Sequence, residues 1–277
     1  AESELLGKKW HGAEGGRIRY ALCPRFVLSC SEQIWKAARD LAEQHGWLIH
    51  THASENASEV ALVKETLGVD NIAYFVERGI AGERLVLAHC VHLSEREEAM
   101  LAKSGTHVVH CPGANLKLAS GFAPVPRLLA QGVNVALGAD GAPCNNTLDA
   151  FHEMRLAATL HLPRFGPKQM PPAEVLAMAT INGARALGLE REIGSLEVGK
   201  QADIAVVDLS GAHLNPRGRD LHANLVYGAR ASDVTDVLVA GRALVRSRKL
   251  RTLDVASLVA AAPKAIAGVL RRAGLEA

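Results

Sequence analysis

A histidine-rich stretch, IHTHASE at residues 49–55, brings two imidazoles and a carboxylate close together in the chain. His50 and His52 alternate within an apolar run, which is the spacing of two side chains on one face of a β-strand. Glu55 follows three residues after His52, where the strand is expected to end. Imidazole and carboxylate groups are ligands of zinc and iron in proteins. His52 is therefore a candidate metal ligand and Glu55 a candidate acid, whereas His50 fits equally well a buried histidine bonded to the backbone.

Three other apolar segments end on the same kinds of side chain. RLVLAH ends at His89, THVVHC carries His110 near its end, and VNVALGAD ends at Asp140. Together with His52 they match a divalent metal site that activates water for hydrolysis at neutral pH. Asp140 would take the proton of the water, Glu55 would protonate the leaving group, and His89 would stabilise developing charge. The alternatives are a core histidine at residue 89, a helix cap at residue 140 and a structural role for His110.

The elements that must position these residues alternate between strands and helices. The expected strands are residues 17–22, 47–52, 84–89, 106–111 and 133–140, and the expected helices are 31–46, 58–67, 72–78, 94–105, 124–132, 148–160 and 172–188. Strands joined by helical crossovers form a parallel sheet with helices packed outside it. This pattern predicts an α/β fold of the (β/α)-barrel type, in which catalytic groups gather at the carboxyl ends of the strands.

The chain changes character after Gly188, where Gly turns separate β-rich segments, and its last thirty residues favour a peripheral helix. We expect three parts: a barrel portion over residues 1–190, a β-sandwich portion over 191–250 and a C-terminal helix over 251–277. A closed barrel needs eight strands, and only five are found. The two open sheet edges would favour aggregation, oligomer formation or pairing with a missing segment.

Composition excludes several classes of protein. The 277 residues are 48% hydrophobic and 22% charged, with a net charge of +2, which is ordinary for a globular protein and gives no sign of nucleic-acid binding. No apolar run is long enough to span a membrane. Five cysteines without paired spacing fit reduced thiols in the cytoplasm. Twelve histidines are many for this length and favour a metal site.

Several ordered motifs resemble the amidohydrolase superfamily, in its branch of hydrolytic deaminases and chlorohydrolases. They are HTHASE, LAHCVHL, HCPGANLKLASGFAPVPRLLAQGVNVALGADGAPCNN, LDAFHEMR, MATINGARALGL and IGSLEVGKQADIAVVD. The resemblance implies a (β/α)8 barrel with a composite β-sandwich and one divalent metal, zinc or iron. It also implies that His52 and Asp140 are metal ligands, that Glu55 is a proton shuttle and that His89 contacts water or substrate.

The chain departs from this family at its amino-terminal end. The resemblance assigns Glu55 to an H-x-x-E motif on the fifth barrel strand, so that strands four to eight are present and the H-x-H ligand pair of the first strand is not. With only two protein ligands, metal affinity is expected to fall by orders of magnitude. A missing N-terminal segment or a second polypeptide would then complete the site, and an inactive truncated barrel is the alternative.

The substrate is expected to be a small heterocycle. CPRFVLSCSE at residues 23–32 resembles guanine deaminases, in which Arg25 would bond a ring carbonyl and Phe26 would stack on the base. The alternative is a loop-capping arginine and a core phenylalanine. GADGAPCNNTLDAFHEMR looks closer to deaminases of S-adenosylhomocysteine, methylthioadenosine and 5′-deoxyadenosine. We therefore expect hydrolytic deamination of a purine of guanine or adenosine type with release of ammonia, or else a triazine-type chlorohydrolase or aminohydrolase.

Overall fold

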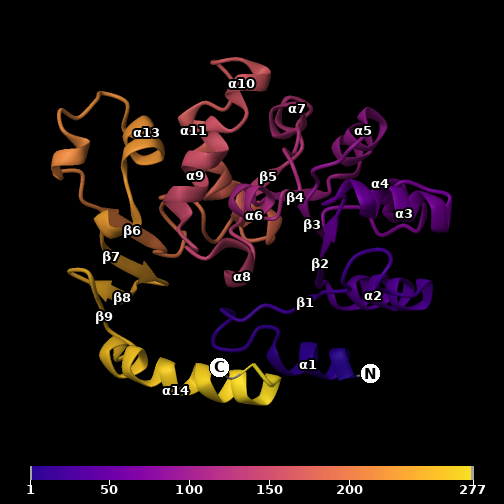
Figure 1. Cartoon of the computed structure of the whole chain (residues 1–277), viewed down its shortest axis with the longest axis horizontal. Helices are drawn as coiled ribbons and strands as arrows, with labels where there is room; N and C mark the ends of the chain where they lie inside the picture. Colours follow the sequence, from indigo (N-terminus) through magenta and orange to yellow (C-terminus); the bar gives the residue numbers. More distant parts are fainter. Residues whose placement is uncertain (1, 276–277) are drawn as a thin grey trace.

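A five-stranded parallel sheet forms the centre of the computed structural model, which describes residues 2–275 (Figure 1). Its strands lie in chain order and are β1 (Ala21–Leu22), β2 (Leu48–Ala53), β3 (Leu85–His89), β4 (His107–His110) and β5 (Val135–Leu137). All four neighbouring pairs are parallel. The carboxyl ends of the five strands therefore meet at one edge of the sheet.

The strand register determines which side chains share a face. His52 is paired with Ala88, and Ala88 is paired with Val109, so these three residues lie on one face of the sheet. The other face of the sheet carries the alternating residues, such as Thr51 and Leu87, and both of these are buried beneath the helices.

Short polar signals fix the ends of the crossover helices. Helix α2 (Glu32–His45) begins after Ser31, whose hydroxyl accepts from the Ile34 N–H, and ends at Gly46, which adopts φ 68°. Helix α5 (Glu95–Ser104) begins with a reciprocal capping box between Ser94 and Glu97. The other helices of the barrel portion are α3 (Ala57–Leu67), α4 (Asn71–Glu77), α6 (Pro112–Lys117), α7 (Val125–Ala130), α8 (Ala142–Asn145), α9 (Ala150–Thr159), α10 (Leu162–Phe165), α11 (Pro172–Met178) and α12 (Ile181–Ala186).

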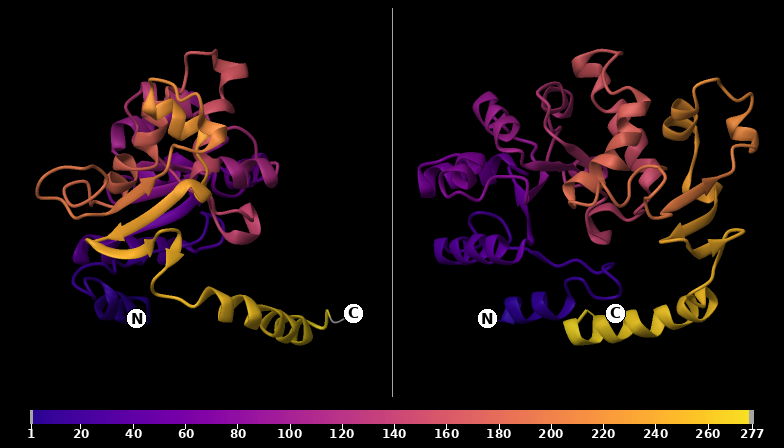
Figure 2. Two further views of the ribbon diagram at one scale, coloured as in Figure 1. Left: turned by 90° about the vertical axis from the view of Figure 1, so that its left-hand side faces the viewer. Right: turned by 180° about the vertical axis from the view of Figure 1, so that it is seen from behind.

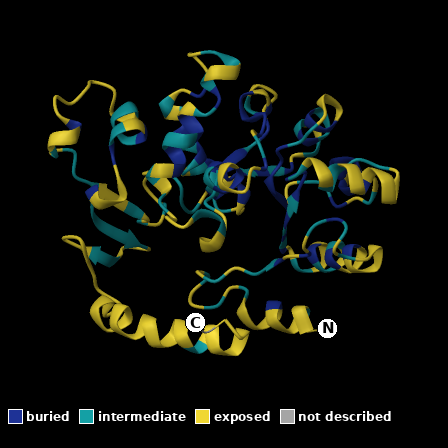
Figure 3. Ribbon diagram, in the orientation of Figure 1, coloured by how far each residue is buried: buried dark blue, intermediate teal, exposed yellow. Residues whose placement is uncertain are grey.

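The hydrophobic core lies between the sheet and these helices (Figure 3). Trp35, Phe75, Leu87, Leu128 and Met178 are fully buried there. Each such side chain stabilises the fold by about 1.5–3 kcal/mol relative to an exposed position. This packing holds the strands, and hence the residues at their ends, in a fixed arrangement.

A second, antiparallel sheet follows in the chain and contains β6 (Ile204–Val207), β7 (Val234–Val239), β8 (Arg242–Arg246) and β9 (Lys249–Leu250). Short helical turns precede β7, among them α13 (Leu221–Ala223). Helix α14 (Val255–Ala273) runs along the outside of the molecule and contains no buried residue (Figure 2). Among the described residues, no helix combines the length and the hydropathy needed to cross a membrane.

The predicted strand and helix order is confirmed, with differences in detail. The predicted helix over 172–188 is two helices, because Thr180 leaves helical geometry at φ −130° and ψ −96°. Strand β1 is only two residues long, and an unpredicted helix α1 (Glu2–Trp10) precedes it. The expected boundaries at residues 190 and 250 stay a prediction, and of the predicted C-terminal segment 251–277, residues 276–277 lie outside the described part of the chain.

Candidate active site

The His52 imidazole lies at the carboxyl end of β2, in a stack of three rings. The Phe26 ring packs on it with centroids 4.6 Å apart and planes 16° apart, and the His89 ring lies 5.4 Å away at 18°. Phe26 adopts φ 51° just after β1, so the turn there directs its ring onto the histidine. The predicted residues His52, His89 and Phe26 are thus brought together.

Burial keeps the His52 imidazole neutral. Desolvation, followed by the positive charges that His89, His50 and Arg25 can carry, lowers the pKa of His52 to about 4. Its Nδ1 atom is buried and has no hydrogen-bond partner among the described residues. A neutral imidazole with an unpartnered nitrogen is the form in which histidine binds a metal ion.

His89 reaches the site through an unusual backbone conformation. The pleat of β3 would place residue 89 on the face opposite His52, but His89 adopts φ 73° and its ring stacks beside that of His52. Its Nδ1 atom lies 2.8 Å from the Asn115 Oδ1 atom of α6, and both side chains are buried. Its Nε2 atom lies 3.8 Å from Glu55 Oε2. The ring is therefore oriented by Asn115 on one side and faces a carboxylate on the other.

The Glu55 carboxyl group is buried at the turn between β2 and α3. The Ser120 hydroxyl donates to Glu55 Oε1 at 3.3 Å, and Ser120 itself is only 4% exposed. A carboxyl group fixed beside a histidine and shielded from bulk water is suited to carry a proton to or from a substrate.

Asp140 follows β5 by three residues and is exposed, with φ 62°. One of its carboxylate oxygens accepts from the Gly141 N–H at 2.6 Å, which leaves the other oxygen free of that contact. The charge of Asp140 raises the pKa of His52 slightly against the stronger effect of desolvation, as expected for nearby groups.

The donor set is compatible with a metal ion but small. His52 offers a neutral imidazole and Asp140 a carboxylate, which are normal ligands of zinc and iron. Within residues 2–275 no group of three or more histidine, cysteine, aspartate or glutamate side chains is arranged to hold a metal ion. Burial raises the pKa of the nearby Cys111 thiol to about 12, so this thiol is not available as a thiolate ligand.

Two other residues considered from the sequence, Arg25 and His110, lie beside or outside the cluster of His52, Glu55 and His89. Arg25 is exposed, with its guanidinium carbon 5.8 Å from the Phe26 ring centre. His110 points away to the helix side of β4, where its Nε2 atom lies 3.4 Å from that of His161. The structural role expected for His110 fits this contact, and its convergence with His52 and Asp140 on one rim stays a prediction.

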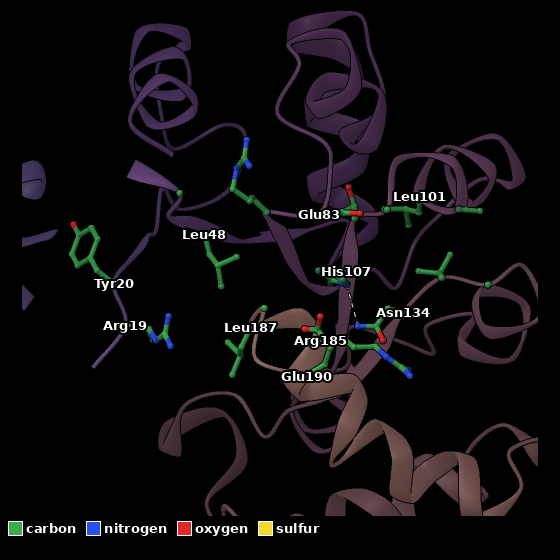
Figure 4. Close-up of a pocket in the computed structure, with 18 of the residues that line it drawn as sticks. Arg19, Tyr20, Leu48, Glu83, Leu101, His107, Asn134, Arg185, Leu187 and Glu190 are labelled. Carbon is green, nitrogen blue, oxygen red and sulfur yellow. Dashed lines mark hydrogen bonds between the residues drawn. The ribbon is translucent and has the colours of Figure 1, made fainter. Parts of the chain in front are cut away.

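A cavity of about 630 Å³ lies at the opposite end of the sheet (Figure 4). Leu48, Arg84, His107 and Asn134 line it, and each stands at or just before the start of a strand. His107 bonds to Asn134 there at 3.0 Å. The candidate catalytic residues therefore do not line this cavity, and its size does not locate the active site.

Asn115 and Ser120 were not predicted as site residues. Both lie within GANLKLASG, a segment singled out only as part of a longer motif. Their contacts with His89 and Glu55 link positions 26 and 65 residues apart, so strand periodicity gives no signal for them.

Comparison with known proteins matches residues 2–244 to the amidohydrolase family. The chain belongs to this family. The resemblance inferred from the motifs is confirmed, and the predicted (β/α)-barrel type of fold is consistent with the five-stranded parallel sheet described above.

Three relatives narrow the comparison. The 5-methylthioadenosine/S-adenosylhomocysteine deaminase of Moorella thermoacetica is 45% identical over 258 residues, which are 93% of this chain and 60% of the relative. A zinc-bound adenosine deaminase of Xanthomonas campestris superposes with a TM-score of 0.91 at 38% identity, covering 95% of this chain and 60% of that one. The atrazine chlorohydrolase of Arthrobacter aurescens, complexed with zinc, gives 0.87 at 27% identity, covering 94% and 57%. The chain thus spans about 60% of the length of its curated relatives.

Proposed function

We propose that this amidohydrolase is part of a metal-dependent deaminase that removes ammonia from an adenosine-type purine. The single observation that supports this most is the cluster of His52, Glu55 and His89 at the strand ends, where the rings of the two histidines are 5.4 Å apart. The identity to the Moorella deaminase points to an adenosine-type substrate in place of the guanine-type alternative.

His52 and Asp140 are the residues that would hold the metal ion, and zinc is the metal bound by the Xanthomonas relative. The ion would supply acidification of a water molecule at neutral pH. Catalytic zinc sites use three protein ligands, and this chain offers two. Further donors from another part of the enzyme or from a second chain are therefore part of the proposal.

The chain's own residues would move and stabilise the protons. Glu55, held by the Ser120 hydroxyl, would deliver a proton to the leaving amino group. His89, held by Asn115, would donate to or orient the substrate atom on which charge develops. Asp140 would accept the proton of the attacking water.

Phe26 and Arg25 are the proposed substrate contacts. One face of the Phe26 ring is covered by His52, so a base would have to use its edge or its other face. The Arg25 guanidinium is exposed nearby and can donate hydrogen bonds to a ring acceptor.

Ammonia release with zinc present tests the proposal, using 5′-methylthioadenosine, S-adenosylhomocysteine and adenosine as substrates. Glu55→Gln should lower kcat by about 10²–10⁴-fold, and Asp140→Asn should abolish both turnover and zinc retention. Glu65→Gln, which changes an exposed carboxylate on α3, is the matched control. If the chain holds zinc together with the further donors and still releases no ammonia, the proposed function is refuted.

A triazine substrate is the second candidate, because the Arthrobacter relative superposes over 94% of this chain. Atrazine and an aminotriazine are added to the substrate series to separate the two candidate functions. A triazine hydrolase would release chloride or an alkylamine from these compounds, whereas a purine deaminase would release ammonia from a nucleoside. An inactive chain that needs a partner is the third, and elemental analysis showing no bound zinc or iron would favour it.

A cytoplasmic location and a homo-oligomeric state remain proposals. The five cysteines form no disulfide in the structure, which suits a reducing compartment. Within residues 2–275 no strand pairs with the outer edges of β1 and β5, which favours association with a second chain or a further segment. A monodisperse monomer by light scattering would contradict the oligomeric state.

A further inference from the structure

A buried carboxylate that the proposed chemistry does not use lies on α9. Glu153 shares the buried face of this helix with Met154, Ala157 and Ala158, and it is only 1% exposed. A carboxylate on such a face is stable only when hydrogen-bond donors satisfy it. Glu153 therefore has a specific task in the structure.

Two donors from two other elements satisfy this carboxylate. The Gly113 N–H, at the start of α6, donates to Oε2 at 2.9 Å, and the Asn145 side-chain amide, at the end of α8, donates to Oε1 at 2.7 Å. A Cβ atom at residue 113 would lie 2.3 Å from Glu153 Oε1, so only glycine permits this approach. Glu153 thus ties three helices together at one point.

The segment after Asp140 needs such a tie because its backbone is strained. Asp140, Asn146 and Leu148 all adopt positive φ, at 62°, 73° and 48°. Non-glycine residues hold such conformations only where the surroundings impose them. The Asn145 Oδ1 atom accepts from the backbone of Leu148 at 3.0 Å and from the Thr147 hydroxyl at 2.8 Å, so the amide held by Glu153 also closes this turn.

Lys117 reinforces the same segment from α6. Its ammonium group donates to the Pro143 carbonyl at 2.6 Å and to the Asn146 side chain. Helix α6 also carries Asn115, which orients His89. Helix α6 therefore contacts both the segment that follows Asp140, through Lys117, and His89, through Asn115.

We propose that Glu153 is a positioning residue: by clamping Asn145 and Gly113 it fixes the segment that follows Asp140 and so sets the direction of the Asp140 carboxylate. The inference rests on the proposed function, because only that function gives the Asp140 carboxylate a metal ion to bind. The hydrogen bonds of Glu153 themselves involve no metal ion. The Gly141 N–H donates to the Asp140 carboxylate at 2.6 Å, so its hydrogen exchange measures how firmly that carboxylate is held.

A donor–acceptor exchange tests the clamp. Glu153→Gln replaces one acceptor oxygen with an NH2 group, so that this group and the Asn145 amide become two facing donors. If the Asn145 amide turned over to compensate, Thr147 and Leu148 would lose their acceptor. Adding Asn145→Asp restores an acceptor opposite the new donor and keeps an oxygen for the turn. The double variant has the same net charge as the wild type.

Amide hydrogen exchange of the metal-free chain is the readout, with urea unfolding alongside. We expect Glu153→Gln to speed exchange at Gly141, Thr147 and Leu148 by about 10–100-fold, because losing a hydrogen bond to a charged acceptor makes local opening of this segment easier. The double variant, which restores a donor–acceptor pair, should return exchange to within about threefold of wild type. Glu65→Gln should change neither.

Two results would overturn the inference. One is unchanged exchange at Gly141 in Glu153→Gln; the other is a double variant that exchanges as fast as the single one. Unchanged exchange at Gly141 together with a loss of unfolding free energy is the pattern that a merely structural role of Glu153 predicts. Failure of the proposed function shows separately, as zinc binding without ammonia release when the chain is assayed together with the further donors.

Discussion

Acid should destabilise this protein through the buried pair of His110 and His161. The two side chains are 0% and 1% exposed, and their Nε2 atoms are 3.4 Å apart, so one must donate and the other accept. Neither Nδ1 atom has a partner among the described residues. A proton added to the accepting ring would leave two N–H groups facing each other in a dry environment, and both rings are therefore neutral in the folded state.

The size of the effect follows from the pKa of His161. Desolvation lowers this pKa from 6.5 to about 4, and desolvation together with His161 and His89 lowers the pKa of His110 well below its usual value. Below pH 6.5 the unfolded chain binds protons that the folded chain does not, so stability falls as pH falls towards 4. Between pH 7.5 and pH 5, His161 alone should reduce the free energy of unfolding by about 2 kcal/mol. His110 acts in the same direction.

Urea unfolding at several pH values between 7.5 and 5 measures this loss. In His161→Phe the loss over that interval should be smaller than in wild type by about 2 kcal/mol, whatever the stability of the variant at pH 7.5. His152→Gln removes an exposed histidine on α9 and should keep the wild-type pH dependence. A variant at residue 161 with the full wild-type slope would show that the buried pair does not carry the acid sensitivity.

Three further outcomes are expected. Asn115→Leu removes the acceptor 2.8 Å from His89 and should lower kcat by about 10–100-fold with little change in KM, measured as ammonia release. Chelation of zinc should abolish turnover reversibly, and an activity that survives dialysis against chelator would remove the metal from the mechanism. Trp35→Ala empties a fully buried site and should cost about 3–5 kcal/mol in urea unfolding, without local effects at Asp140.

Much of the parallel sheet and its crossover helices could be predicted from the sequence, because their signals are local. Apolar runs of strand length alternate with capped amphipathic helices, as at Ser31 and Gly46 around α2, and such alternation fixes a parallel sheet. The strand ends then place His52 and His89 at one edge. Short or irregular segments were less predictable, since β1 and the turns before β7 are held by contacts distant in sequence and not by their own periodicity.

The contacts that orient the site could not be predicted in this way. Glu153 on α9 accepts from a backbone group 40 residues away, and Asn115 and Ser120, from a short helix and a loop, act on groups 26 and 65 residues away. A polar residue in such a segment has no periodic signature that distinguishes a buried hydrogen-bond partner from a solvated side chain.

The different positions of His89 and His110 show what decides whether a histidine at a strand end enters the site. Because Ala88 is paired with Val109, residues 89 and 110 both follow on the face turned away from His52. His89 crosses to the other side because its backbone adopts φ 73°, whereas His110 remains in the extended strand and packs on His161. The same residue type at the same place in neighbouring strands therefore stacks on His52 in one case and packs against His161 in the other. Backbone conformation at the last strand residue, and not distance along the sequence, makes the distinction.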